Sequence, residues 1–212
     1  GKSLVEGCPM VYFGDENGWR HAVEDMEELH RRTAKVFPGV PYFLFGHSMG
    51  SFLSRTHLIR YPGRLDGCVL CGTGHMSPAL IAGGKLIAAR EIRRLGRKAY
   101  SAKADQLAFG AYNKPFAPNR TRFDWISTSE ANVDAYIADP LCGGDTTLGL
   151  FRDMLGGLGI ITKQANIGMD KDLPVLFIAG DQDPVGEMGK GVRRAYQAFR
   201  KAGVGDVSIK LY

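Results

Sequence analysis

The chain has 212 residues, a formal net charge of +5, and 44% hydrophobic and 23% charged residues. This is the composition of an ordinary globular protein, and the length suffices for one well-buried core. No run approaches the roughly 18 apolar residues of a bilayer-spanning helix, and the first residues lack a signal-peptide pattern, so we expect a cytoplasmic protein. The basic residues are not interleaved with aromatic residues as they are in nucleic-acid-binding modules, so we expect no nucleic-acid partner.

The cysteines predict neither disulfides nor a redox site. Cys8, Cys68, Cys71 and Cys142 do not form a disulfide framework in a chain of this length. Cys68 and Cys71 make a C-x-x-C pair, but they lie in the apolar run 67–71, where a buried strand would point them to opposite faces. We expect small core thiols. Because no His, Cys or Gly spacing matches a metal or nucleotide site, we also expect no metal and no cofactor.

The first predicted helix covers residues 16–37, whose apolar residues recur at helical spacing. It ends at Phe37-Pro38-Gly39, where proline prevents continuation. Residues 42–45 form a short, continuously apolar strand, as is typical of a parallel sheet with both faces covered.

A Gly-x-Ser-x-Gly motif, Gly46 to Gly50, follows this strand and precedes the predicted helix 51–60. In this context the motif predicts a nucleophilic serine, Ser48, raised on a sharp turn. Glycines are needed because the strand and helix backbones pass close by. The amide of Met49, at the first turn of the helix, can donate to a developing oxyanion. A plain glycine-rich turn between strand and helix is the alternative.

Strands and helices alternate again at both ends of the remaining chain. Residues 65–71, 174–179 and 207–212 are predicted strands, and residues 189–202 a helix. This alternation predicts an α/β fold with a parallel sheet and right-handed crossovers. His75 follows the end of a strand, so it lines the pocket or contacts substrate, or is an ordinary loop histidine.

Almost a hundred residues between Gly74 and Asp172 contain no convincing strand. Such length favours a functional helical insertion above the sheet. We therefore divide the chain into a core with the serine turn (1–75), a lid (76–171) and a second part of the core (172–212). One helical stripe in the lid comprises Ala88, Ile92, Leu95 and Ala99, and another comprises Leu148, Phe151, Met154, Leu155 and Leu158.

The second stripe, with Phe151 and Met154, is predicted to line an acyl pocket, with simple lid packing as the alternative. Opposite the first stripe lies a basic patch consisting of Arg90, Arg93, Arg94, Arg97 and Lys98. It suits transient contact with anionic lipid headgroups, and a solvated helix face is the alternative.

The five histidines are weighed by position. His21, His30 and His57 fall on predicted helices and are expected to be surface or packing residues. His47 adjoins Ser48, but neighbouring side chains on a turn diverge, so it is a structural hydrogen-bonding residue or a substrate contact. No histidine follows the aspartates Asp181 and Asp183, where the order Ser, Asp, His would place a general base.

Several motifs together resemble a known family. They are residues 45–51, Tyr61 to Gly67 with Gly72-Thr73-Gly74, and Phe177 to Gly186; Phe123-Asp124-Trp125 and residues 139–143 are similar to a bacterial branch. The chain resembles α/β-hydrolases of the monoacylglycerol lipase, lysophospholipase and serine aminopeptidase-like group. The resemblance implies the α/β-hydrolase fold with a helical lid between the sixth and seventh strands, and an ester substrate with a single acyl chain.

The resemblance also assigns the acid. Asp183 matches the family's Gly-x-x-Asp position at the end of a strand, whereas Asp181 suits a loop cap. Asp170 and Asp172 precede the strand, at its wrong end. A peptidase or amidase of the same fold and a non-catalytic binding module remain alternatives.

The ends of the chain are compared with the same family. Gly1-Lys2-Ser3 is similar to the end of a G-x-G-K-S segment, and Tyr212 precedes the place of a Pro-Gly-x-x-His segment that carries the base histidine. We therefore expect a segment whose general base and second oxyanion donor lie elsewhere. Without preceding strands, residues 42–45 become an exposed sheet edge that favours association. The oligomeric state stays open.

Overall fold

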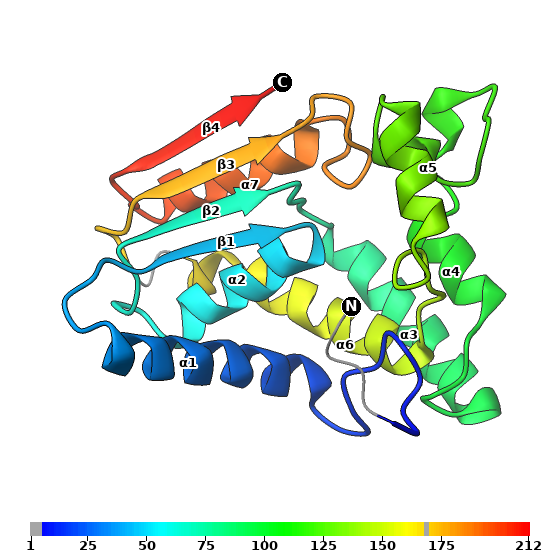
Figure 1. The fold of residues 1–212 in the computed structure, drawn as a ribbon, viewed down its shortest axis with the longest axis horizontal. Coiled ribbons are helices and arrows are strands. Elements are labelled where there is room, and N and C mark those ends of the chain that lie inside the picture. The colour runs from blue at the N-terminus through cyan, green and yellow to red at the C-terminus, as the bar shows by residue number, and fades with distance from the viewer. Residues whose placement is uncertain (1–5, 168–169) are drawn as a thin grey trace. The chain divides into compact units, whose positions relative to one another are not determined.

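A computed structural model describes residues 6–167 and 170–212 (Figure 1). The motif Gly1-Lys2-Ser3 lies outside the described residues. The chain divides into two compact units: an insertion unit of Gly1–Gly18 and Gly83–Asp153, and a sheet unit of Trp19–Ala82 and Met154–Tyr212. These ranges differ from the expected division at residues 75 and 171. One reason is that Gly157, on the last helix before the third strand, packs directly against the Trp19 indole.

The sheet unit contains four parallel strands in the order β1-β2-β3-β4 (Figure 1). Their bounds are Phe43–His47 for β1, Gly67–Cys71 for β2, Val175–Ala179 for β3 and Val207–Leu211 for β4. The predicted parallel sheet is therefore confirmed. Because every strand runs the same way, all four carboxyl ends lie at one edge of the sheet, where ligands bind in open α/β folds.

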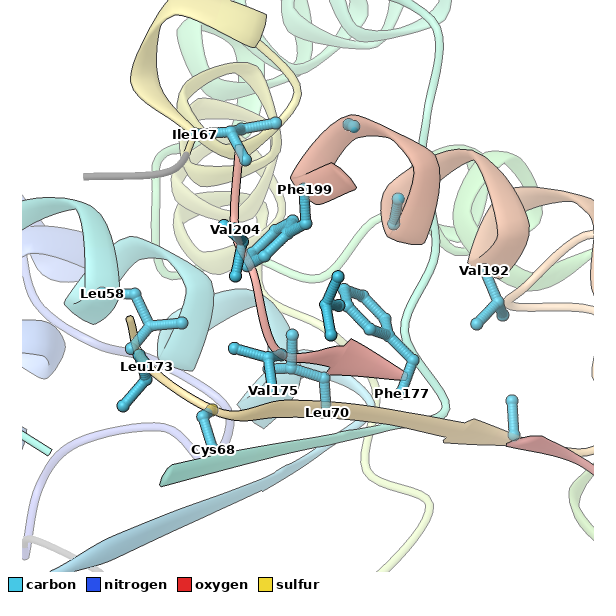
Figure 2. Close-up of a cluster of buried hydrophobic side chains, with 14 residues drawn as sticks. Leu58, Cys68, Leu70, Ile167, Leu173, Val175, Phe177, Val192, Phe199 and Val204 are labelled. Carbon is cyan, nitrogen blue, oxygen red and sulfur yellow. The ribbon is translucent and has the colours of Figure 1, made fainter. Parts of the chain in front are cut away.

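A buried apolar cluster joins one face of the sheet to helix α7, Lys190–Lys201 (Figure 2). Leu70 of β2, Phe177 of β3 and Val192 of α7 are fully buried. Phe177 meets Phe199 edge to face, with ring centroids 5.2 Å apart. This packing fixes the positions of β2 and β3, whose ends carry the loops of the site.

Two further helices of the sheet unit, α1 (Gly18–Val36) and α2 (Met49–Arg60), are joined by buried polar contacts. His57 Nε2 lies 3.0 Å from Glu27 Oε2, and the His57 side chain is almost fully buried. Trp19 Nε1 donates to Thr56 Oγ1 over 3.1 Å. His57 thus packs between helices, as predicted. Each buried polar atom in these pairs gains a partner that replaces water.

Strand β1 forms one edge of the sheet. The Phe43 and Phe45 side chains are 67% and 62% exposed, so the expectation that both faces of this strand are covered is wrong. The expected exposed edge is confirmed instead. The physical reason is that alternate side chains of a strand share one face, and Phe43 and Phe45 point to the face opposite the buried cluster, against which Leu44 packs.

The insertion unit is helical. It contains most of α3 (Pro78–Leu95), α4 (Ala102–Phe109), η1 (Lys114–Phe116), η2 (Asp124–Ile126), α5 (Glu130–Ala138) and the first part of α6 (Leu148–Ile161). The short helix η3 (Gln164–Asn166) follows α6 in the sheet unit. Between residues 72 and 174, omitting 168 and 169, extended pairing is limited to one isolated bridge from Tyr100 to Thr147. The segment is therefore helical, as its pattern predicts, and its role as a lid stays a prediction.

Part of the predicted basic patch is paired with acids. Arg97 Nη2 donates to both oxygens of Asp153, each over 3.0 Å. Arg94 bonds the buried Glu91 over 2.9 Å. These pairs anchor the patch within the unit and reduce the positive charge that it offers to an anionic surface.

Within the described ranges, no helix has both the length and the apolar character needed to cross a bilayer.

Candidate active site

Ser48 stands at the turn between β1 and α2, with backbone angles φ 51° and ψ −120°. A residue other than glycine with positive φ is strained, and such strain concentrates at functional turns. The turn is held from two sides: the Ser48 amide donates to the Cys71 carbonyl over 2.9 Å, and the Ser51 hydroxyl donates to the Ser48 carbonyl over 2.6 Å. The sharp turn expected from the motif is therefore present.

The two outer glycines of the motif have different roles. A Cβ on Gly46 would collide with Ser54 Oγ and would lie 2.6 Å from the Gly50 carbonyl oxygen, both on α2. A Cβ on Gly50 would meet nothing within 4 Å. Close passage of strand and helix thus requires glycine at position 46, as the sequence predicts, but not at position 50.

The Ser48 hydroxyl is not used as a helix cap. Ser48 occupies the N-cap position of α2, where serine usually accepts a hydrogen bond from the first turn, yet its side chain makes no capping bond. The side chain is partly exposed. Met49 is the first residue of α2, so its N–H has no acceptor within the helix and suits an oxyanion.

The loop after β2 lies between the serine turn and the acid loop. Gly72 has φ 57°, and a Cβ there would sit 3.3 Å from His47 Cε1 and 3.4 Å from Asp183 Oδ2. His47 and Asp183 therefore flank the same glycine. His47 Nδ1 also lies 3.3 Å from Cys71 Sγ. The carboxyl ends of β1, β2 and β3 thus bring His47, Cys71 and Asp183 together beside Ser48.

The Asp183 carboxylate is held by its own loop. Its Oδ1 accepts the Val185 N–H over 2.9 Å. Burial raises the pKa of Asp183, while hydrogen bonds from the Val185 and Gly186 amides and the nearby His47 act in the opposite direction. A half-buried carboxylate with two backbone donors suits the orientation of a histidine more than contact with bulk water.

The rival Asp181 lies in a different environment. Its side chain is exposed, and its backbone amide donates to the Tyr212 carbonyl over 2.9 Å. Asp170 accepts the Gly63 amide over 3.0 Å and lies before β3. The geometry favours Asp183 of the three.

His75 follows the Gly72–Gly74 loop. Its carbonyl accepts a bond of 3.4 Å from Arg194, and its Nδ1 is buried without a hydrogen-bond partner among the described residues. Burial lowers the pKa of His75, and Arg55 and Arg194 lower it further. A neutral, half-buried imidazole at this edge suits pocket lining, which stays a prediction.

The predicted acyl-pocket residues lie on α6. Phe151 belongs to the part of the helix in the insertion unit and is 4% exposed, and Met154 belongs to the part in the sheet unit and is partly exposed. Their role in an acyl pocket stays a prediction.

Sequence analysis missed two residues at this edge. Cys71 was expected to be a core thiol, but it contacts His47, and both burial and the nearby Asp183 raise its pKa. Arg55 was assigned no role, yet it is 1% exposed. A basic residue one turn away from the apolar Phe52 and Leu58 of the same helix is the signal that could have found it. In the described parts of the chain, no three His, Cys, Asp or Glu side chains gather as a metal site would require.

Known proteins share this architecture. The chain is 29% identical over 167 residues to a monoacylglycerol lipase of Mycolicibacterium smegmatis, covering 76% of this chain and 51% of that protein. It is 25% identical to human monoglyceride lipase, covering 99% of this chain and 64% of the relative. The crystal structure of a carboxyl esterase from Bacillus coagulans superposes with a TM-score of 0.84 at 26% identity, covering 92% of this chain and 63% of the esterase.

The chain thus spans about half to two thirds of the length of these proteins. The agreement in architecture confirms the predicted α/β-hydrolase fold. A family model described as "Serine aminopeptidase, S33" matches residues 11–212. The chain belongs to this serine aminopeptidase S33 family.

Proposed function

We propose that this chain carries the nucleophile and the acid of a serine hydrolase that cleaves carboxylic esters of single-chain lipids. The observation that carries the proposal is the strained Ser48, whose hydroxyl is left free of capping at the sheet edge where Asp183 lies. Such strain on a residue other than glycine is stabilised by the surrounding bonds and marks a functional turn.

In the proposed reaction, Ser48 Oγ attacks the ester carbonyl and the Met49 N–H helps to stabilise the oxyanion. A histidine accepts the serine proton and returns it to the leaving alcohol, which produces an acyl-serine that water then hydrolyses. Asp183 orients this histidine. We place the histidine outside the 212 residues, because none of the five histidines follows Asp183, where the order Ser, Asp, His places the base.

The substrate class follows the relatives. Proteins named monoacylglycerol lipase and monoglyceride lipase are the sequence relatives described above, which supports a glycerol ester with one acyl chain. A second candidate, hydrolysis of a peptide or aminoacyl amide, is supported by the family's description as a serine aminopeptidase. Both share the acyl-serine step and differ only in the leaving group.

A fluorophosphonate probe tests the nucleophile in the protein as its gene encodes it. We expect labelling that is lost in Ser48→Ala and lowered at least about a hundredfold in Asp183→Asn. Asp181→Asn is the matched control and should label at the normal rate. Labelling that does not depend on Ser48 would favour a non-catalytic binding module. Turnover of monoacylglycerols but not of aminoacyl amides then separates the two candidate substrates.

A further inference from the structure

Arg55 is a buried cation without a carboxylate partner among its recorded contacts. It lies on α2, seven residues after Ser48, and is 1% exposed. Burial lowers the pKa of its guanidinium. A buried charge is unfavourable unless hydrogen bonds and dipoles compensate for its lost water, so the groups that it meets indicate its role.

The guanidinium is compensated by backbone carbonyls on two other elements. Nη1 donates to the Gly74 carbonyl over 2.8 Å, and Nη2 donates to the Ile161 carbonyl over 3.0 Å. Ile161 is the last residue of α6, a helix with no basic residue in its final turn. A cation at a helix C-terminus is stabilised by the helix dipole. Arg55 therefore joins three segments: α2, the end of α6 and the loop after β2.

The loop held by Arg55 touches the acid loop. Gly74 faces the Val185 carbonyl oxygen so closely that a Cβ on Gly74 would lie 2.6 Å from it. Val185 in turn donates its N–H to Asp183 Oδ1. The chain of contacts runs from Arg55 through Gly74 and Val185 to the carboxylate.

A cavity beside Arg55 does not account for the charge. Its volume is about 20 Å³, roughly that of one water. Asp170 also lines it, but no hydrogen bond or ion pair among the described residues joins Asp170 to Arg55, and the rest of the lining is apolar, including Leu58, Leu173 and Phe199. It is too small for an acyl chain and offers no second cation for an anionic ligand. The two terminal nitrogens of the guanidinium instead point their donors at the Gly74 and Ile161 carbonyls.

We propose that Arg55 is a positioning residue that holds the loop after β2, and through Gly74 the acid loop, so that the Val185 N–H stays on the Asp183 carboxylate. The role deepens the proposed function, since it treats Asp183 as the acid. It acts through the Gly74 and Ile161 carbonyls and through the Thr73 hydroxyl of the same loop, which accepts from Nη1 over 3.4 Å. Arg55 touches neither the serine nor the substrate in this scheme.

The test follows the Asp183 carboxyl carbon by NMR during a pH titration of the 212-residue protein, with Asp183→Asn to assign the signal. His47 and Cys71 also face this carboxylate and are present in every sample. In Arg55→Met and Gly74→Ala, loss of the Val185 bond should raise the Asp183 midpoint by about 0.5 pH unit or more. Arg55→Lys, which retains a donor for Gly74, should restore the normal midpoint.

Two controls separate positioning from general destabilisation. Leu173→Ala removes a buried side chain from the same cavity, and Gly83→Ala adds a methyl group where nothing lies within 4 Å. Both should leave the midpoint within about 0.1 pH unit of the unsubstituted protein. If Arg55→Met does not fold, Arg55→Gln decides, because a methyl group on Gly74 would displace the Val185 carbonyl whatever residue stands at position 55.

An unchanged midpoint in the folded Arg55 variants, or an equal rise in Leu173→Ala, overturns the proposal. Because the titration needs no turnover, its outcome is independent of whether the protein hydrolyses esters. Failure of the proposed function would instead appear as probe labelling that survives Asp183→Asn.

Discussion

Gly46→Ala should destabilise the protein, whereas Gly50→Ala should not, although both glycines belong to the same five-residue motif. The added methyl group at position 46 would collide with Ser54 Oγ and lie 2.6 Å from the Gly50 carbonyl oxygen. A side-chain oxygen can rotate away, but the carbonyl is part of the α2 backbone. Relief therefore requires separation of β1 from α2 along their whole contact.

The size of the effect follows from this geometry. Overpacking against side chains costs about 1–3 kcal/mol, and contact with rigid backbone puts Gly46→Ala near the upper end, at about 3 kcal/mol. For a domain of this size, such a loss lowers the melting temperature by about 6–12 °C. At position 50 the methyl group has open space on a helix, so replacing glycine should raise stability by up to about 1 kcal/mol.

Urea unfolding followed by circular dichroism measures the free energy of unfolding of both variants. A third variant, Gly46→Ala/Ser54→Ala, separates the clash with Ser54 Oγ from the clash with the Gly50 carbonyl. Removing Ser54 Oγ should recover only part of the loss, because the Gly50 carbonyl remains. Equal destabilisation at positions 46 and 50, or full recovery in the double variant, would refute the assignment of the clash to the helix backbone.

Three further predictions concern the same unit. Ser48→Gly should raise stability by about 1 kcal/mol, since glycine relieves the positive φ at some cost in unfolded-state entropy, while Ser48→Ala retains the strain and gains nothing in thermal melts. Burial lowers the pKa of His57 from its ordinary value of 6.5, so near that pH the unfolded state binds more protons than the folded state. The free energy of unfolding should therefore fall as the pH drops from 7.5 to 5.5, and urea titrations of His57→Gln should show a flatter pH dependence. Cys71 should react slowly with iodoacetamide at pH 8 because burial and Asp183 raise its pKa, and Asp183→Asn should accelerate the reaction a few-fold, whereas the exposed Cys8 keeps its rate. No acceleration would place the two groups farther apart than the structure does.

Local pattern predicted the order and type of the elements in the sheet unit. The helical period before Pro38 yields α1, and short apolar runs bounded by glycine and proline yield β1, β2 and β3. The serine turn was predictable because its glycine, serine and flanking elements are adjacent in sequence. Each of these signals is local, and local steric rules determine each of them.

What the sequence could not predict depends on contacts between distant segments. Cys71 and His47 are 24 residues apart and meet only because β1 and β2 pair in register with His47 opposite Cys71. The bond from Arg55 to Ile161 spans 106 residues. Exposure of Phe43 and Phe45 depends on which face of the sheet the buried cluster covers, which their apolar character does not reveal.

The margin of the sheet at β1 has a practical consequence for handling this segment. Its outer amides and carbonyls face no further strand among the described residues, and the rings of Phe43 and Phe45 meet solvent beside them. At high concentration, copies of the chain should therefore associate by pairing their β1 strands. Light scattering should rise with protein concentration and fall again on dilution. A lysine in place of Phe43 would place a charge on that margin and keep the segment dispersed, while the opposite end of the strand, with Ser48, stays unaltered.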